Sequence, residues 1–230
     1  MKQLQHDRKY GELDQVLSAF LGQPADDTPE QPSAALQAYL RHTWHARPWA
    51  IGIAEHQLRD YAHNPPGRLK LKLGEYYPLP DVSIGEESVL DWLLVLADHL
   101  RASVDSGEVP APGPPRTHWE WRARFPELAQ LLGGWFSQDM SDEFTGHEAA
   151  LADYLDTTDQ HLIARAAGEV AELLALDLEE SDYAVGLAEL GLEMEPPAPY
   201  SPSGWLALLA DRLGGPRAEY GPSRKAEYDS

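Results

Sequence analysis

Apolar residues recur three and four positions apart along most of the chain, with polar residues between them, which is the pattern of helices that bury one face. In PELAQLLGGW, Pro126 stands in the first helical turn and the apolar positions share one face. The same pattern predicts helices at 10–21, 33–46, 48–62, 86–103, 156–176, 181–190 and 203–213, besides one over AALADYL. The chain is therefore predicted to be mainly α.

Two local signals refine this picture. Thr145 and Glu148 have the spacing of a capping box, which predicts that Thr145 caps the AALADYL helix. The segment RLKLKL, residues 68–73, alternates strictly like a strand, but the sequence offers it no evident pairing partner.

The helical pattern occurs twice. YGELDQVLSAFLGQ at 10–23 is matched by FPELAQLLGGWFSQ at 125–138, and SAALQAYL at 33–40 by EAALADYL at 148–155, both at an offset of 115 residues. Later, WLLVLADHL at 92–100 is matched by WLALLADRL at 205–213, at an offset of 113 residues. Because the landmarks recur in order, they predict a tandem duplication.

The predicted organisation is therefore two tandem related helical units, at residues 1–105 and 118–215. They are joined by SGEVPAPGPPRT, residues 106–117, a linker rich in Pro and Gly that cannot continue a helix. Residues 216–230 are expected to form a flexible polar tail. Trp92 and Trp205 hold equivalent positions among leucines and are predicted to be core residues. Trp119 and Trp121, just after the linker, are candidates for joining the two units.

Charge distinguishes the two halves. The chain has a net charge of −20 and 43% hydrophobic residues, enough apolar mass for a globular fold. Residues 1–115 hold 10 basic and 16 acidic groups, whereas residues 116–230 hold 8 and 22. Such a negative field repels nucleic acid and acidic membranes, and it speeds encounter with a basic protein. Solubility alone also explains an acidic surface, so both interpretations stay open at this point.

Composition also bears on location. The absence of cysteine excludes disulfides and thiol chemistry and fits a reducing cytoplasm. The N-terminal residues lack the apolar core of a signal peptide, and no run approaches the ~20 apolar residues of a membrane span. We expect a cytoplasmic protein with neither a membrane nor a nucleic-acid partner.

Motifs for chemistry are few. No stretch matches a P-loop, a dinucleotide-binding glycine motif, a nucleophile elbow or a zinc-protease motif. The histidine pairs His42 with His45 and His56 with His63 share helix faces, but carboxylates at ligand spacing are missing, so we predict no metal and no cofactor. The acids of QDMSDEF, residues 138–144, lack the glycine and distal glutamate of a calcium loop. Beside the aromatic helix end, they are instead suited to pair with Arg or Lys of a partner.

Together, FPELAQLLGGWFSQDMSDEF, AALADYL, ELLAL with DLEESDY, LGLEMEPP and SGWLALLADRL resemble the immunity proteins of bacterial contact-dependent growth inhibition systems, over about residues 124–214. The resemblance implies a small helical antidote without catalytic activity that binds the toxic C-terminal domain of a delivered effector. The first copy departs from the pattern, because Pro24 and Ala25 follow Gln23 where the second copy continues with Asp139. We therefore expect the second copy to hold the binding function.

Many delivered toxins are nucleases with basic phosphate-binding grooves, so we expect the cognate toxin domain to be basic. The expected partner-binding residues are Trp135, Gln138, Asp139, Asp142, Glu143, Phe144, Glu179, Glu180, Asp182 and Tyr183. Two alternatives stay open: a non-catalytic helical scaffold that binds another protein, and an enzyme that combines the acids of residues 139–143 with His147 or His161. The pattern predicts no particular oligomeric state.

Overall fold

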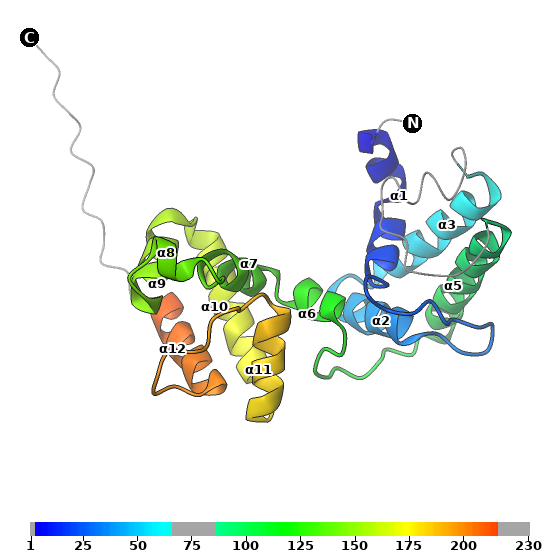
Figure 1. The fold of residues 1–230 in the computed structure, drawn as a ribbon. Coiled ribbons are helices and arrows are strands. Elements are labelled where there is room, and N and C mark those ends of the chain that lie inside the picture. The colour runs from blue at the N-terminus through cyan, green and yellow to red at the C-terminus, as the bar shows by residue number, and fades with distance from the viewer. Residues whose placement is uncertain (1–2, 66–85, 216–230) are drawn as a thin grey trace, which may run out of the picture.

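The computed structural model describes residues 3–65 and 86–215 (Figure 1). These residues form 11 helices and no strand, which confirms the mainly α class. The first unit contains α1 (Gln3–Ser18), α2 (Ala34–Ala46), α3 (Trp49–His63) and α5 (Glu86–Ser106). The second unit contains α6 (His118–Arg124), α7 (Pro126–Trp135), α8 (Met140–Glu143), α9 (His147–Thr157), α10 (Gln160–Leu174), α11 (Glu180–Glu189) and α12 (Pro202–Gly214).

Each unit buries its own hydrophobic cluster. In the first unit α3 packs between α1 and α5, and the cluster includes Tyr39, Leu58 and Trp92. In the second unit α10 packs between α7 and α12, and the cluster includes Tyr154 and Trp205. Trp92 and Trp205 are 5% and 2% exposed, which confirms their prediction as core residues.

Two buried aromatic residues that lie 115 positions apart each interrupt a helical path. The α1 helix is kinked at Tyr10 (φ −127°, ψ 26°), and 115 residues later Phe125 (φ −126°, ψ 57°) separates α6 from α7. Both side chains are buried. These correspondences agree with the duplication predicted from the sequence, which itself stays an inference.

Polar caps begin several of the helices. Side-chain oxygens of Ser33, Thr117 and Ser201 accept hydrogen bonds from backbone N–H groups in the first turns of α2, α6 and α12. The prediction of a Thr145 cap is wrong, because the residue before α9 is Gly146, which makes no side-chain cap. Its expected partner Glu148 forms an ion pair with Arg212 at 2.8 Å instead.

The helix predicted at 156–176 has different bounds in the structure, where residues 156 and 157 belong to α9 and the following helix is α10, Gln160–Leu174. The α9 helix ends at Thr157, and α10 begins after Asp159, whose extended backbone (φ −59°, ψ 138°) interrupts the helical path. The strand predicted at 68–73 and the tail predicted at 216–230 lie outside the described residues. No helix among the described residues is long and apolar enough to cross a membrane.

The short helix α6 connects the two units. Trp119 packs against the first cluster, where its ring centroid lies 6.0 Å from that of Tyr39, whereas Trp121 belongs to the second cluster. Trp121 lies so close to Gly186 of α11 that a Cβ there would stand 2.6 Å from the indole Cη2. The two neighbouring tryptophans thus anchor opposite faces of α6 in different cores, as their position after the linker suggested.

Candidate partner-binding surface

The acidic segment predicted to bind a partner follows α7 and contains the short helix α8. The backbone N–H of Gln138 donates to a carboxylate oxygen of Glu193 at 2.9 Å, and the N–H of Glu193 donates to the carbonyl of Phe136 at 3.2 Å. Met140 is buried beneath the segment. The predicted binding residues divide accordingly: Gln138, Asp139, Asp142 and Glu143 are exposed, and Phe144 is partly buried against the second cluster. The segment therefore presents its carboxylates to solvent from a fixed backbone.

The second predicted segment lies at the start of α11. Glu180 accepts hydrogen bonds from the hydroxyl groups of Ser201 and Ser203, and the Ser203 bond is the main reason why the pKa of Glu180 is lowered. Tyr183 is 5% exposed, and its hydroxyl donates to the carbonyl of Leu174 at 3.1 Å. Glu179 and Asp182 are exposed. In this segment Glu180 and Tyr183 join neighbouring helices, while Glu179 and Asp182 face solvent.

The two predicted segments do not form one surface. Figure 1 shows α8 beside α9 at one end of the second unit, whereas α11 lies at the other end, near α6. A partner that contacts both segments would have to extend along the whole unit. The structure thus places the predicted residues in two separate patches.

Trp135 brings a further acidic helix face into the candidate surface. Its indole N–H donates to a carboxylate oxygen of Asp153 at 3.0 Å, and its ring stands edge-on to Tyr154, with centroids 4.9 Å apart. Asp156 is exposed one turn further along α9. Asp153 and Asp156 were not predicted as site residues. The sequence ALADYLD does point to them, because its two acids are three positions apart and therefore share the polar face of a helix.

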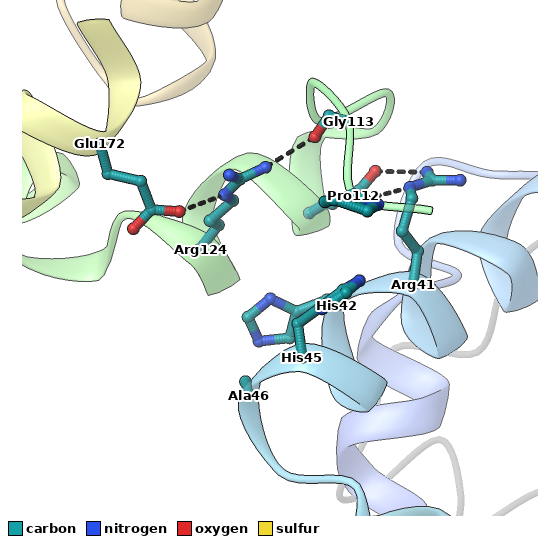
Figure 2. Close-up of a pocket in the computed structure, with 9 residues that line it drawn as sticks. Arg41, His42, His45, Ala46, Pro112, Gly113, Arg124 and Glu172 are labelled. Carbon is teal, nitrogen blue, oxygen red and sulfur yellow. Dashed lines mark hydrogen bonds and ion pairs between the residues drawn. The ribbon is translucent and has the colours of Figure 1, made fainter. Parts of the chain in front are cut away.

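A cavity of about 250 Å³ lies where the two units meet (Figure 2). On one side, Nε and Nη2 of Arg41 donate to the two carboxylate oxygens of Glu120, each at 2.7 Å. On the other, Arg124 donates to Glu172 at 2.7 Å and to the carbonyl of Gly113. Both guanidinium groups that line the cavity are thus neutralised by carboxylates.

The same cavity holds two histidines of α2. Burial is the main reason why the pKa of His42 is lowered, and its ring stands edge-on to Trp119 with centroids 5.5 Å apart. His45 Nε2 lies 2.9 Å from the carbonyl oxygen of Pro110 in the linker. Among the described residues no group of three or more His, Asp or Glu side chains is arranged to hold a metal ion. The lining side chains therefore bind α2 to the linker and α6.

The groups required by the enzyme alternative either face solvent or are engaged in other contacts. His147 stacks on Phe136, with centroids 5.7 Å apart, and its Nε2 lies 3.0 Å from the carbonyl oxygen of Glu195. His161 is exposed on α10, while Asp139, Asp142 and Glu143 face solvent on or beside α8. The histidine beside these acids in sequence is thus engaged in packing and a backbone contact.

One carboxylate inside the second unit has a strongly shifted pKa. Burial raises the pKa of Glu169 to about 7, although hydrogen bonds from the backbone N–H groups of Glu127 and Leu128 oppose the shift. The Leu128 N–H lies 2.8 Å from the carboxylate oxygen. Because these N–H groups belong to the first turn of α7, Glu169 holds the start of the helix that leads to the acidic segment.

The second unit is thus all-helical, with exposed acidic patches around a buried hydrophobic cluster. Residues 124–213 match the family model described as CdiI immunity protein. The resemblance stated from the sequence is confirmed over this range. The match begins at the last residue of α6, so it does not cover the first unit. No curated protein and no solved structure matched the chain.

Proposed function

We propose that the protein binds the C-terminal toxin domain of a contact-dependent growth inhibition effector and neutralises it. The observation that carries this proposal is the family match over residues 124–213, which spans both patches of predicted binding residues. The protein acts as a stoichiometric inhibitor in this account, so it needs a complementary surface and no catalytic group. Its location is the cytoplasm of the cell that it protects.

We further propose that the toxin domain is basic, as expected of a nuclease. Between residues 138 and 195 the chain has 16 acidic side chains and one basic side chain, Arg165. Arg165 is itself paired with Glu127 at 3.0 Å, so it does little to weaken the field. A nuclease groove must attract phosphates, and the same basic groove attracts carboxylates on a protein.

The first unit has a supporting role in this proposal. It lies outside the family match. Its helix α2 contacts α6 through the bidentate ion pair of Arg41 with Glu120. Glu120 is 3% exposed and the Arg41 side chain is 14% exposed, so salt screens this pair less than it screens an exposed pair. The first unit thereby fixes the start of the second unit while the acidic patches stay accessible.

Protection of living cells tests the function. The toxin domain encoded beside the gene of this protein is expressed under tight control, with or without the protein, and surviving cells are counted. We expect the full chain to restore growth and an empty vector to leave the cells inhibited. A toxin with an inactivating mutation controls for expression burden. Equal killing with and without the protein, at confirmed expression of both, would contradict the proposal.

A further inference from the structure

Within the chain, a helix of one unit docks on a helix of the other: α6 packs on α2. In the first unit, α2 receives α6 by two contacts: Arg41 forms the ion pair with Glu120, and the rings of Tyr39 and His42 contact Trp119. The α6 helix is part of the second unit, so α2 is here the receiving surface of one unit for a helix of another.

The equivalent helix of the second unit is α9. Leu36 and Tyr39 of α2 correspond to Leu151 and Tyr154 of α9 at the offset of 115 residues, and all four side chains are buried. The same offset places Asp156 at the position of Arg41. The register of the receiving face is therefore fixed by buried neighbours on both helices.

The two faces differ in what covers them. Arg41 and His42 are half-buried against α6, whereas Asp156 and Thr157, which hold their positions, are exposed. Figure 1 shows α9 at the end of the second unit that lies away from the first unit. The part of the receiving face at Asp156 and Thr157 is thus open in the second unit, whereas Tyr154, which corresponds to Tyr39, is buried beside Trp135.

The charge at this position is reversed. Arg41 pairs with a carboxylate, that of Glu120, whereas a carboxylate at the corresponding position, Asp156, attracts a cation. Asp153 lies one turn before Asp156 and accepts a hydrogen bond from Trp135, so an acid and an aromatic ring flank the face. An Arg of a partner is well suited to such a site, because it can pair with the carboxylate and stack on the indole.

We propose that the exposed face of α9 formed by Asp153, Asp156 and Thr157, together with the adjoining, partly buried Trp135 at the end of α7, is the surface that receives a basic segment of the toxin domain, with Asp156 as its central contact. This inference rests on the proposed function and deepens it, because it selects one surface and one partner chemistry. Neither Asp153 nor Asp156 belongs to the two acidic segments predicted from the sequence. The family match does not single them out either.

A second copy of the chain is the competing occupant. The segment equivalent to α6 is the first half of α1, where Leu4 and Gln5 correspond to Trp119 and Glu120. Gln5 offers Asp156 no opposite charge, and two chains with a net charge of −20 repel each other. A basic partner therefore fits the face better than self-association does.

The test reverses the charge at residue 156 by introducing the residue type found at position 41. Asp156→Arg places the first unit's residue at the equivalent position, and an Arg in the last turn of α9 is compatible with the helix dipole. The matched control is Asp91→Arg, at an exposed acid on α5 of the first unit, which changes the net charge equally. Binding to the toxin domain encoded beside the gene is measured for the wild type and both variants, with light scattering for oligomeric state.

We expect Asp156→Arg to weaken binding by at least about tenfold, mainly through slower association, and Asp91→Arg to change it by less than about twofold. Equal affinities of the two variants would overturn the α9 surface and leave the immunity function intact. A wild-type protein that neither binds nor inhibits the toxin domain would overturn the function and this inference together. A dimer that Asp156→Arg dissociates would show that a second copy occupies the face, which also overturns the inference.

Discussion

The carboxylate of Glu169 accepts a 2.8 Å hydrogen bond from the backbone N–H of Leu128. In the first unit, Gln57 accepts hydrogen bonds from the N–H groups of Glu12 and Leu13, both at 2.9 Å. Leu13 lies 115 residues before Leu128, and Gln57 lies on α3, which packs against α1, as Glu169 lies on α10, which packs against α7. A neutral amide thus accepts from Leu13 in the first unit, and a carboxylate accepts from Leu128 in the second.

This difference predicts that Glu169→Gln stabilises the protein at pH 7.5. The amide keeps an oxygen for the two N–H groups, as Gln57 does, but it carries no charge to be buried beside Glu127. We expect a rise of about 2–4 °C in the melting temperature, equivalent to roughly 1 kcal/mol. Thermal unfolding followed by circular dichroism measures it. An unchanged or lower melting temperature would show that burial of the charged Glu169 carboxylate does not destabilise the native state at this pH.

The pH dependence follows from the same group. The pKa of Glu169 is raised from 4.5 to about 7 by folding, so the native state binds more protons than the unfolded state between these values. Its contribution to stability is therefore present below about pH 4.5 and is lost as the pH rises toward 7. We expect Glu169→Gln to remove this component of the pH profile, and Gln57→Glu to add a similar one in the first unit. Parallel curves of stability against pH for the wild type, Glu169→Gln and Gln57→Glu would contradict the assignment of this pH dependence to Glu169.

The ion pair between the units is predicted to stabilise the whole chain. Glu120→Gln leaves Arg41, whose side chain is 14% exposed, without its charged partner. Removal of one member of a buried pair is strongly destabilising, and we expect a loss of about 2–3 kcal/mol because Arg41 retains some solvent contact. The control is Arg101→Gln, which breaks the exposed pair with Asp105 and should cost less than about 0.5 kcal/mol. Urea unfolding of both variants distinguishes them; equal effects would contradict the prediction.

The close contact of Trp121 with α11 predicts that a methyl group added at Gly186 destabilises the protein. In Gly186→Ala the new Cβ would stand 2.6 Å from the indole, so the ring or α11 must move, with an expected loss of about 1–3 kcal/mol. Gly168→Ala is the matched control, since no other group lies within 4 Å of its Cβ, and it should stabilise α10 by about 0.5–1 kcal/mol. Urea midpoints that shift in the same direction would contradict this account of α6.

The acidic segment beside α8 gives a kinetic prediction. Asp139 and Glu143 are exposed and lie outside the helix core, so their replacement by Ala should leave the fold intact. If they help attract a basic toxin domain, the double variant should associate more slowly at low salt and show a flatter salt dependence, by about a factor of 2–5 in rate. Stopped-flow association at several salt concentrations measures both effects. Unchanged kinetics would exclude this segment from the binding surface.

Strong periodicity explains why most helices were predicted from the sequence. Long amphipathic stretches such as those of α3 and α5 carry enough apolar positions to define a buried face. The α6 helix was missed because its seven residues place Trp119 and Trp121 in different cores, so no single face is apolar. The break before α10 was predicted between residues 155 and 156, a few residues too early, because residues that tolerate helix continue on both sides of it. A local pattern cannot show where the chain turns when both flanking segments favour helix.

The candidate site was predictable only in part. Acidity and the family resemblance identified the second unit and its exposed carboxylates. The Arg41–Glu120 pair joins residues 79 positions apart, and no local pattern links them. The same holds for Asp156, since its correspondence to Arg41 matters only once α6 is seen to dock on α2. Such relationships depend on the packing of whole helices and need the fold.

The central claim is that this chain captures a toxin domain by charge and shape. The most direct test is co-purification of the full chain with the toxin domain encoded beside its gene, repeated at about 50 and 500 mM salt. We predict an equimolar complex at both concentrations, with slower association at the higher salt and with loss of toxin activity in the complex. If no complex forms at about 50 mM salt or none forms at about 500 mM salt, with both proteins folded, the account is contradicted.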